Sequence, residues 1–185
     1  MQFKPLQISS AFAIEIEPVP DERGAFARIF CAHEFSERGL VSHFLQHSLS
    51  CNTRRGTVRG LHFQAHPFLE TKLVRCIKGT AFAVLLDLRE DQATFGRWCA
   101  IELSADARNA LYVPRGCASG FQTLVDDCDL EYLISPQYVP EASRGVRWDD
   151  PLVGIEWPIK EGVILSERDR ALPSIAAIKP HLSLI

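Results

Sequence analysis

The stretch Lys72-Leu73-Val74-Arg75-Cys76-Ile77-Lys78-Gly79-Thr80-Ala81-Phe82-Ala83-Val84-Leu85-Leu86-Asp87-Leu88 contains two strand-like runs separated by a glycine turn signal. Residues 80–88 are apolar at both odd and even positions, which is typical of a strand covered on both faces in a β-sandwich. In residues 72–78 the charged side chains of Lys72 and Arg75 fall on opposite faces. A charged side chain therefore points into a polar space, such as the interior of a jelly-roll barrel, where ligands bind.

Strand-like runs also occur on both sides of this hairpin. Eleven Gly and eleven Pro are spread along the chain and separate short apolar segments, as in an all-β domain. Short helices are expected only at Ala32–Arg38 and at Ser166–Arg170. We predict an all-β jelly-roll β-sandwich or barrel with a few short peripheral helices, in a single domain over residues 1–185. The further predicted strands are Ala11–Glu17, Thr57–Gln64, Arg97–Leu103, Ala110–Val113, Gly120–Leu124 and Leu130–Ser135.

Composition limits the class of protein. A net charge of -3 offers no broad attraction to nucleic acid or to an anionic membrane, so we expect neither as a partner. The longest apolar run, Ala81–Leu86, is far shorter than a membrane-spanning helix, and the first residues lack the apolar core of a signal peptide. The six cysteines form no CxxC pair. We interpret them as reduced thiols of a cytoplasmic protein.

The segment Arg59-Gly60-Leu61-His62-Phe63-Gln64 is the richest in reactive groups. His62 can act as a general base, and Lys72 can stabilise negative charge. From these residues alone another interpretation is open, in which His62 is satisfied by a neighbouring carbonyl and Lys72 reaches solvent. Strict alternation puts Arg59 and His62 on opposite faces, and a bulge at Gly60 would bring both to one site.

A metal site of the cupin type requires His-x-His and a later Pro-x-Gly-x-x-His. In this chain Gln64 and Ser119 stand at two of the histidine positions. His66 and Glu70 keep an even spacing from His62, but Pro67 breaks any helix that would gather them. We therefore expect no metal ion.

Three other residues have both a structural and a chemical interpretation. Asp169 completes a capping-box-like helix start with Ser166, or it orients a histidine; the sequence alone favours the cap. Tyr132 lies in a predicted strand, where it packs its ring or donates a proton to a carbanion. Arg23 lies in a polar turn, where it binds a phosphate or is solvated.

Motifs along nearly the whole chain occur in an order that resembles the dTDP-4-dehydrorhamnose 3,5-epimerase family. The resemblance implies a cupin-type jelly roll, usually a homodimer, that needs no metal or cofactor. It also implies inversion of carbon centres next to the ketone of a nucleotide-diphospho-4-keto-6-deoxy sugar. The motifs are Asp21–Phe26, Arg59–Gln64, Lys72–Arg75, Asp87–Arg89, Thr94–Gly96, Glu102–Ser104, Pro114–Gly116, Gly120-Phe121, Trp148–Pro151, Ile155–Pro158 and Leu165–Asp169.

The resemblance also implies roles for individual residues. His62 matches the family's base, Asp169 its carboxylate partner, Lys72 the lysine that stabilises the oxyanion, and Tyr132 the proton donor. The implied substrate-binding residues are Arg23 and Arg59 for the diphosphate, Gln46, Tyr138 as the aromatic that stacks on the base, and, at further binding positions, Phe26, Arg28, Ser48, Ser119 and Arg168.

Departures from the family pattern fall on the binding side. Arg28 stands where the family usually has glutamate, Ser48 where it has asparagine, and Ser119 where it has histidine; Ser143 and Arg168 replace an acid and a lysine. The nucleotide base, the keto sugar and the number of inverted centres therefore stay open. Three alternatives are also open: a metal-free cupin ketoisomerase, a metal-dependent cupin oxygenase, and a non-catalytic sugar-nucleotide binding protein.

Overall fold

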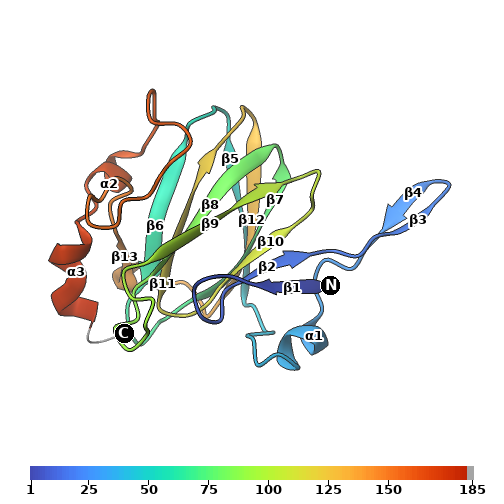
Figure 1. The fold of residues 1–185 in the computed structure, drawn as a ribbon, viewed down its shortest axis with the longest axis horizontal. Helices are drawn as coiled ribbons and strands as arrows, with labels where there is room; N and C mark the ends of the chain where they lie inside the picture. Colours follow the sequence, from blue (N-terminus) through green and yellow to red (C-terminus); the bar gives the residue numbers. More distant parts are fainter. Residues whose placement is uncertain (183–185) are drawn as a thin grey trace.

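The computed structural model describes residues 1–182, which form two antiparallel sheets packed face to face (Figure 1). This arrangement confirms the predicted cupin-type β-sandwich; residues 183–185 of the expected domain lie outside the described residues. The six-stranded sheet runs β1 (Gln2–Pro5), β2 (Phe12–Glu15), β10 (Ala110–Val113), β7 (Thr71–Lys78), β12 (Cys128–Ser135) and β5 (Gln46–Asn52). The five-stranded sheet runs β13 (Ser143–Gly145), β6 (Val58–Gln64), β11 (Cys117–Thr123), β8 (Thr80–Asp87) and β9 (Trp98–Ser104).

The strand β8 is covered on both faces, as its sequence predicts. Ala83 and Leu85 lie in the apolar core between the two sheets. Val84 and Leu86 point to the other face, where they pack in a second cluster with Trp157 from the C-terminal segment. Because each face of β8 is buried against a different layer, every position between Thr80 at its start and Asp87 at its end is apolar.

Short helices cover the outside of the sandwich. Phe35 of α1 (Ala32–Ser36) anchors a third cluster on the outer face of the six-stranded sheet. The helices α2 (Glu167–Arg170) and α3 (Ile175–Leu182) lie beside β6 and β13 (Figure 1). Both predicted helices are present, whereas α3 and the one-turn η1 (Pro140–Ala142) were not expected. Within residues 1–182 no helix is long and apolar enough to cross a membrane.

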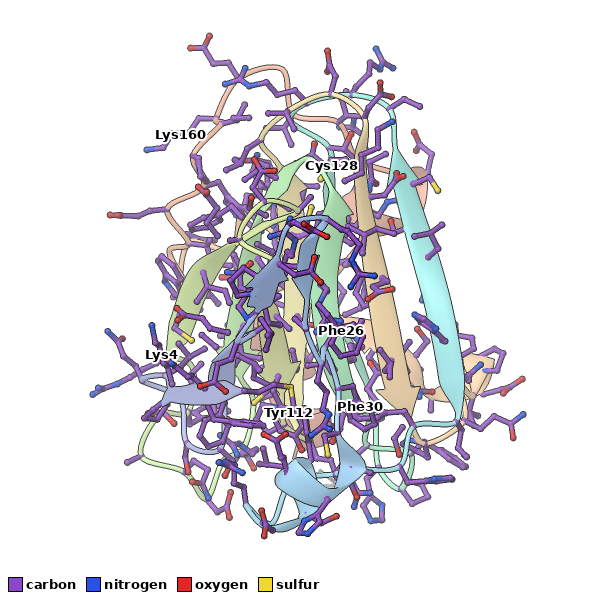
Figure 2. The ribbon with its side chains drawn as sticks, turned by 90° about the vertical axis from the view of Figure 1, so that its right-hand side faces the viewer. Lys4, Phe26, Phe30, Tyr112, Cys128 and Lys160 are labelled. Atoms are coloured by element: carbon purple, nitrogen blue, oxygen red, sulfur yellow. The ribbon has the colours of Figure 1, made fainter. Side chains whose placement is uncertain are left out.

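A separate hairpin, β3 (Val19–Asp21) and β4 (Gly24–Phe26), projects away from the sandwich (Figure 1). All of its strand residues are exposed. The Phe26 side chain keeps 79% of its surface in water. Viewed along the hairpin, Phe26 lies in front of the six-stranded sheet (Figure 2). Val19, which lies opposite Phe26 on β3, is also exposed, so two apolar side chains lie next to each other in solvent.

Candidate active site

A cavity of about 330 Å³ lies between the two sheets. Most of the predicted site residues line it: His62 and Arg59 from β6, Lys72 from β7, Tyr132 from β12, Ser119 from β11, Ser48 from β5, and Tyr138 and Arg168 from the loops and helix at its rim. The polar space expected beside Lys72 is therefore present. Both sheets contribute polar side chains to it.

A bulge in β6 brings Arg59 and His62 to the same cavity. His62 is opposite Ser119 on β11, whereas Arg59 is opposite Phe121, so β6 carries one extra residue between the two pairs. Gly60 makes the bulge possible, because its φ is +122° and a Cβ there would lie 2.7 Å from the Gly120 Cα. The bulge expected at Gly60 is confirmed.

Asp169 contacts the ring of His62. The Nε2–H of His62 donates to Asp169 Oδ1 at 2.7 Å, which leaves Nδ1 as the basic nitrogen of the neutral ring. The Gly60 N–H lies 3.4 Å from Asp169 Oδ2. Burial by itself would raise the pKa of Asp169, but the hydrogen bond from His62, the charge of that ring when it is protonated, the Gly60 N–H and the charge of Arg168 outweigh burial and lower that pKa from its usual value of 3.8. Asp169 therefore stays ionised beside the imidazole.

The same aspartate also belongs to the start of α2. The Ser166 hydroxyl accepts a hydrogen bond from the Asp169 N–H at 3.1 Å, which makes Ser166 the N-cap. The two interpretations of Asp169, helix cap and histidine partner, therefore both hold. The cap orients the backbone so that the carboxylate points toward β6.

The ammonium group of Lys72 lies in the cavity wall. Lys72 Nζ is 2.7 Å from Glu70 Oε1 and 3.4 Å from both the His62 carbonyl oxygen and Ser119 Oγ. Lys72 is 8% exposed, so its charge is mostly shielded from water. An ammonium group in such a place can donate a strong hydrogen bond to a developing oxyanion.

Tyr132 reaches the cavity from the sheet opposite His62. It lies on β12 of the six-stranded sheet, whereas His62 lies on β6 of the five-stranded sheet. Burial raises the pKa of the Tyr132 phenol well above its usual range. The phenol therefore carries its proton at neutral pH and can act as an acid.

The cavity also holds two guanidinium groups. Arg59 Nε donates to Asn52 Oδ1 at 2.7 Å, and Arg168 Nη2 donates to Ser143 Oγ at 2.6 Å. These contacts are made to neutral oxygens, so neither guanidinium is neutralised by them. Arginines of this kind suit an anionic ligand such as a phosphate.

Two glutamines hold the loop that carries Tyr138. Gln46 Oε1 accepts a hydrogen bond from the Tyr138 N–H at 2.6 Å, and Gln64 Oε1 accepts one from the Val139 N–H at 2.8 Å. Gln46 does not itself line the cavity. In this chain its side chain positions the loop that places Tyr138 at the cavity.

Three predicted binding residues lie apart from the cavity. Arg23 pairs with Asp21 at 2.6 Å, and its side chain is 84% exposed. Phe26 is on the same exposed hairpin, and Arg28 makes a long contact of 3.4 Å to Glu34. Within one chain, the structure does not bring these residues together with His62.

The cavity includes polar residues to which the sequence analysis assigned no role. Glu70 and Ser50 line it, and so does Gln64, whose amide nitrogen has no hydrogen-bond partner among the described residues. Glu70 and Lys72 are two positions apart, and side chains at this spacing lie on the same face of a strand. The spacing could therefore have indicated that Glu70 lies beside Lys72. Among the side chains that the structure describes, those of residues 1–178, no group of three or more His, Cys, Asp or Glu is arranged to hold a metal ion.

The fold and the cavity define a cupin-type β-sandwich with a candidate ligand-binding site between its sheets. The chain belongs to the dTDP-4-dehydrorhamnose 3,5-epimerase family, because the model of that family matches residues 5–177. Epimerases are isomerases.

Individual relatives agree with this assignment over almost the full length of the chain. The chain is 39% identical over 178 residues to the dTDP-4-dehydrorhamnose 3,5-epimerase of Sinorhizobium fredii, covering 96% of this chain and 91% of that protein. The crystal structure of the enzyme of that name from Elizabethkingia anophelis superposes with a TM-score of 0.93 at 35% identity, covering 96% and 97% of the two chains. A Legionella pneumophila structure, in complex with dTDP-4-keto-L-rhamnose, has a TM-score of 0.91 at 33% identity and covers 98% and 96%.

Proposed function

We propose that the protein epimerises one or both carbon centres next to the ketone of a nucleotide-diphospho-4-keto-6-deoxy sugar. The observation that carries this proposal is the approach of His62 and Tyr132 to one cavity from opposite sheets. Inversion of a carbon centre needs a base on one face of the sugar and an acid on the other. The family match and the ligand of the Legionella structure support a substrate of this class.

In this proposal each residue has one chemical role. His62 removes the proton from the carbon beside the ketone, and the electron pair of that C–H bond moves onto the ketone oxygen as an enolate. Lys72 donates a hydrogen bond to that oxygen. Tyr132 then delivers its phenolic proton to the other face of the carbon, and exchange with solvent restores both groups. Asp169 keeps the His62 ring in the tautomer that can accept a proton.

The nucleotide part of the substrate is assigned to the rim of the cavity. Arg59 and Arg168 lie there, and within residues 1–182 neither forms an ion pair with a carboxylate, which suits a diphosphate. Tyr138, 42% exposed, offers an aromatic face for the base. Ser48 and Ser119 complete the proposed binding surface. No step in this reaction oxidises or reduces the substrate, so no redox cofactor is proposed.

We also propose a homodimer in which the β3–β4 hairpin of one copy reaches the site of the other. Within the described residues the hairpin pairs with no other strand, and β5 has an unpaired outer edge. An unpaired strand edge is a template for another chain. Arg23, Phe26 and Arg28 would then meet the partner's cavity.

The six free thiols support a reducing, cytoplasmic location.

Solvent deuterium incorporation tests the reaction directly. The protein is incubated in D₂O with dTDP-4-keto-6-deoxyglucose, and exchange at the carbons beside the ketone is followed by NMR. We expect deuterium at one or both centres with inversion, and loss of exchange in His62→Asn. Tyr132→Phe should exchange without inverting, because the base is intact and the acid is not. Absence of exchange with any 4-keto sugar nucleotide that binds would show a binding protein, and a shifted ketone would show an isomerase of another kind.

A further inference from the structure

Glu70 is a buried acid on the cavity wall to which the proposed reaction assigns no role. The residue is 7% exposed, and its Oε1 lies 2.7 Å from Lys72 Nζ. Glutamate and lysine are almost never buried unless they are paired. The pairing accounts for the burial of both side chains.

The contact to Glu70 is the shortest that Lys72 makes among the described residues. The contacts of Nζ to the His62 carbonyl and to Ser119 Oγ are both 3.4 Å. Glu70 immediately precedes β7, and Lys72 is the second residue of that strand, so both side chains project to the same side. The carboxylate thus holds the ammonium group at the place where β6, β7 and β11 meet.

No other cavity residue can supply this negative charge. The remaining charged or titratable side chains on the cavity wall are Arg59, His62, Tyr132, Tyr138 and Arg168, and among the lining residues described Glu70 is the one carboxylate. Asp169 is close by but is bound to His62 at 2.7 Å. Without Glu70, Lys72 would be a largely buried cation near other cations, which is unfavourable.

We propose that Glu70 is the positioning residue of Lys72: its carboxylate keeps the ammonium group charged and directed at the position of the substrate's ketone oxygen. This inference rests on the proposed function, since the role of Lys72 comes from it. Glu70 acts through Lys72 and does not touch the reacting carbon. It should therefore affect the turnover step and its pH dependence more than substrate binding.

Two substitutions separate the charge of Glu70 from its shape. Glu70→Gln keeps the size and the hydrogen-bonding oxygen but removes the charge, whereas Glu70→Asp keeps the charge with a shorter side chain. The control is Glu131→Gln, which breaks an ion pair with Arg75 at 3.0 Å outside the cavity. The readouts are kcat and KM as functions of pH, and the pH midpoint of the Lys72 side-chain NMR signal, assigned with Lys72→Met.

In Glu70→Gln we expect the alkaline limb of kcat and the Lys72 midpoint to move down by about 1–3 pH units, the usual effect of losing one adjacent opposite charge. KM should change little. Glu70→Asp should keep the wild-type midpoint, and so should Glu131→Gln. The proposal would be overturned if Glu70→Gln changed neither the Lys72 midpoint nor the alkaline limb of kcat, or if Glu131→Gln shifted both by the same amount.

The NMR midpoint needs no turnover, so it decides the Glu70–Lys72 coupling even if the wild-type protein exchanges no substrate proton. A wild-type protein that exchanges no substrate proton would instead refute the proposed function. If Glu70→Gln does not fold, the double variant Glu70→Gln/Lys72→Met gives the answer. Coupling predicts that removal of both partners restores the fold, because no unpaired charge is then buried; a double variant that is also unfolded would contradict it.

Discussion

Asp169 shows how one side chain can combine two functions at the scale of a single residue. Its backbone N–H is bound by the Ser166 hydroxyl, while its carboxylate binds His62 and accepts from Gly60. The sequence pattern Ser166-x-x-Asp169 predicts the helix cap because capping is local. The contact with His62 spans 107 positions in the chain, and no local pattern could indicate it.

Substitution of Asp169 by Asn should lower activity by roughly 10²–10⁴-fold, because an amide does not hold the imidazole in the required tautomer. The pKa of Asp169 is lowered in the folded state from 3.8, so its ionised form stabilises the fold above that pH. That stabilisation is lost as the pH falls through the lower, folded-state value. The difference in Tm between the wild type and Asp169→Asn should therefore be largest near neutral pH and shrink toward pH 3.

Glu167→Gln is the matched control for this substitution, since Glu167 is an exposed acid in the first turn of the same helix. It should change neither the activity nor the pH dependence of Tm to a comparable extent. An Asp169→Asn protein with wild-type turnover would remove Asp169 from the mechanism.

At the scale of elements, the strands rich in apolar residues were predictable and the short or mostly polar ones were not. Each of the eight predicted strands is present, though their ends differ by a few residues. The strand β5, with sequence Gln-His-Ser-Leu-Ser-Cys-Asn, was missed because its exposed outer edge and mostly polar side chains leave no apolar period. The hairpin β3–β4 was read only as a polar turn, because its two three-residue strands bury nothing in this chain.

The exposure of that hairpin leads to a prediction about assembly. Phe26→Ser should leave the Tm of the isolated chain nearly unchanged. The Phe26 side chain is 79% exposed and belongs to none of the three apolar clusters of the described residues. It should weaken the proposed dimer and raise the dissociation constant for a nucleotide diphosphate. Sedimentation velocity measures the first effect and calorimetric titration the second.

Leu152→Ser is the control for Phe26→Ser, since Leu152 is also a large apolar residue, 71% exposed, in the C-terminal segment. It should change neither assembly nor affinity. If Phe26→Ser also behaves like the wild type in both measurements, the hairpin has no part in the site.

At the scale of the whole molecule, the net charge of -3 conceals a local excess of positive charge in the cavity. Arg59, Lys72 and Arg168 line it, against the single carboxylate of Glu70 on its wall. Overall composition averages over the surface and so could only exclude a broad attraction to polyanions. The concentration of cations depends on the sheet order and on the Gly60 bulge, which bring residues from β6, β7 and α2 together.

This cationic cavity predicts a selective stabilisation of the protein by nucleotide diphosphates. A ligand at 100 times its dissociation constant adds about 2.7 kcal/mol to the free energy of unfolding, which corresponds to a rise in Tm of about 5–10 °C for a chain of this size. A thermal-shift series with dTDP, UDP, GDP and the corresponding monophosphates measures this. We expect diphosphates to exceed monophosphates, because Arg59 and Arg168 offer two guanidinium groups. The base that gives the largest shift identifies the nucleotide that Tyr138 accommodates. Equal shifts for all anions, inorganic pyrophosphate included, would show that the cavity recognises charge alone.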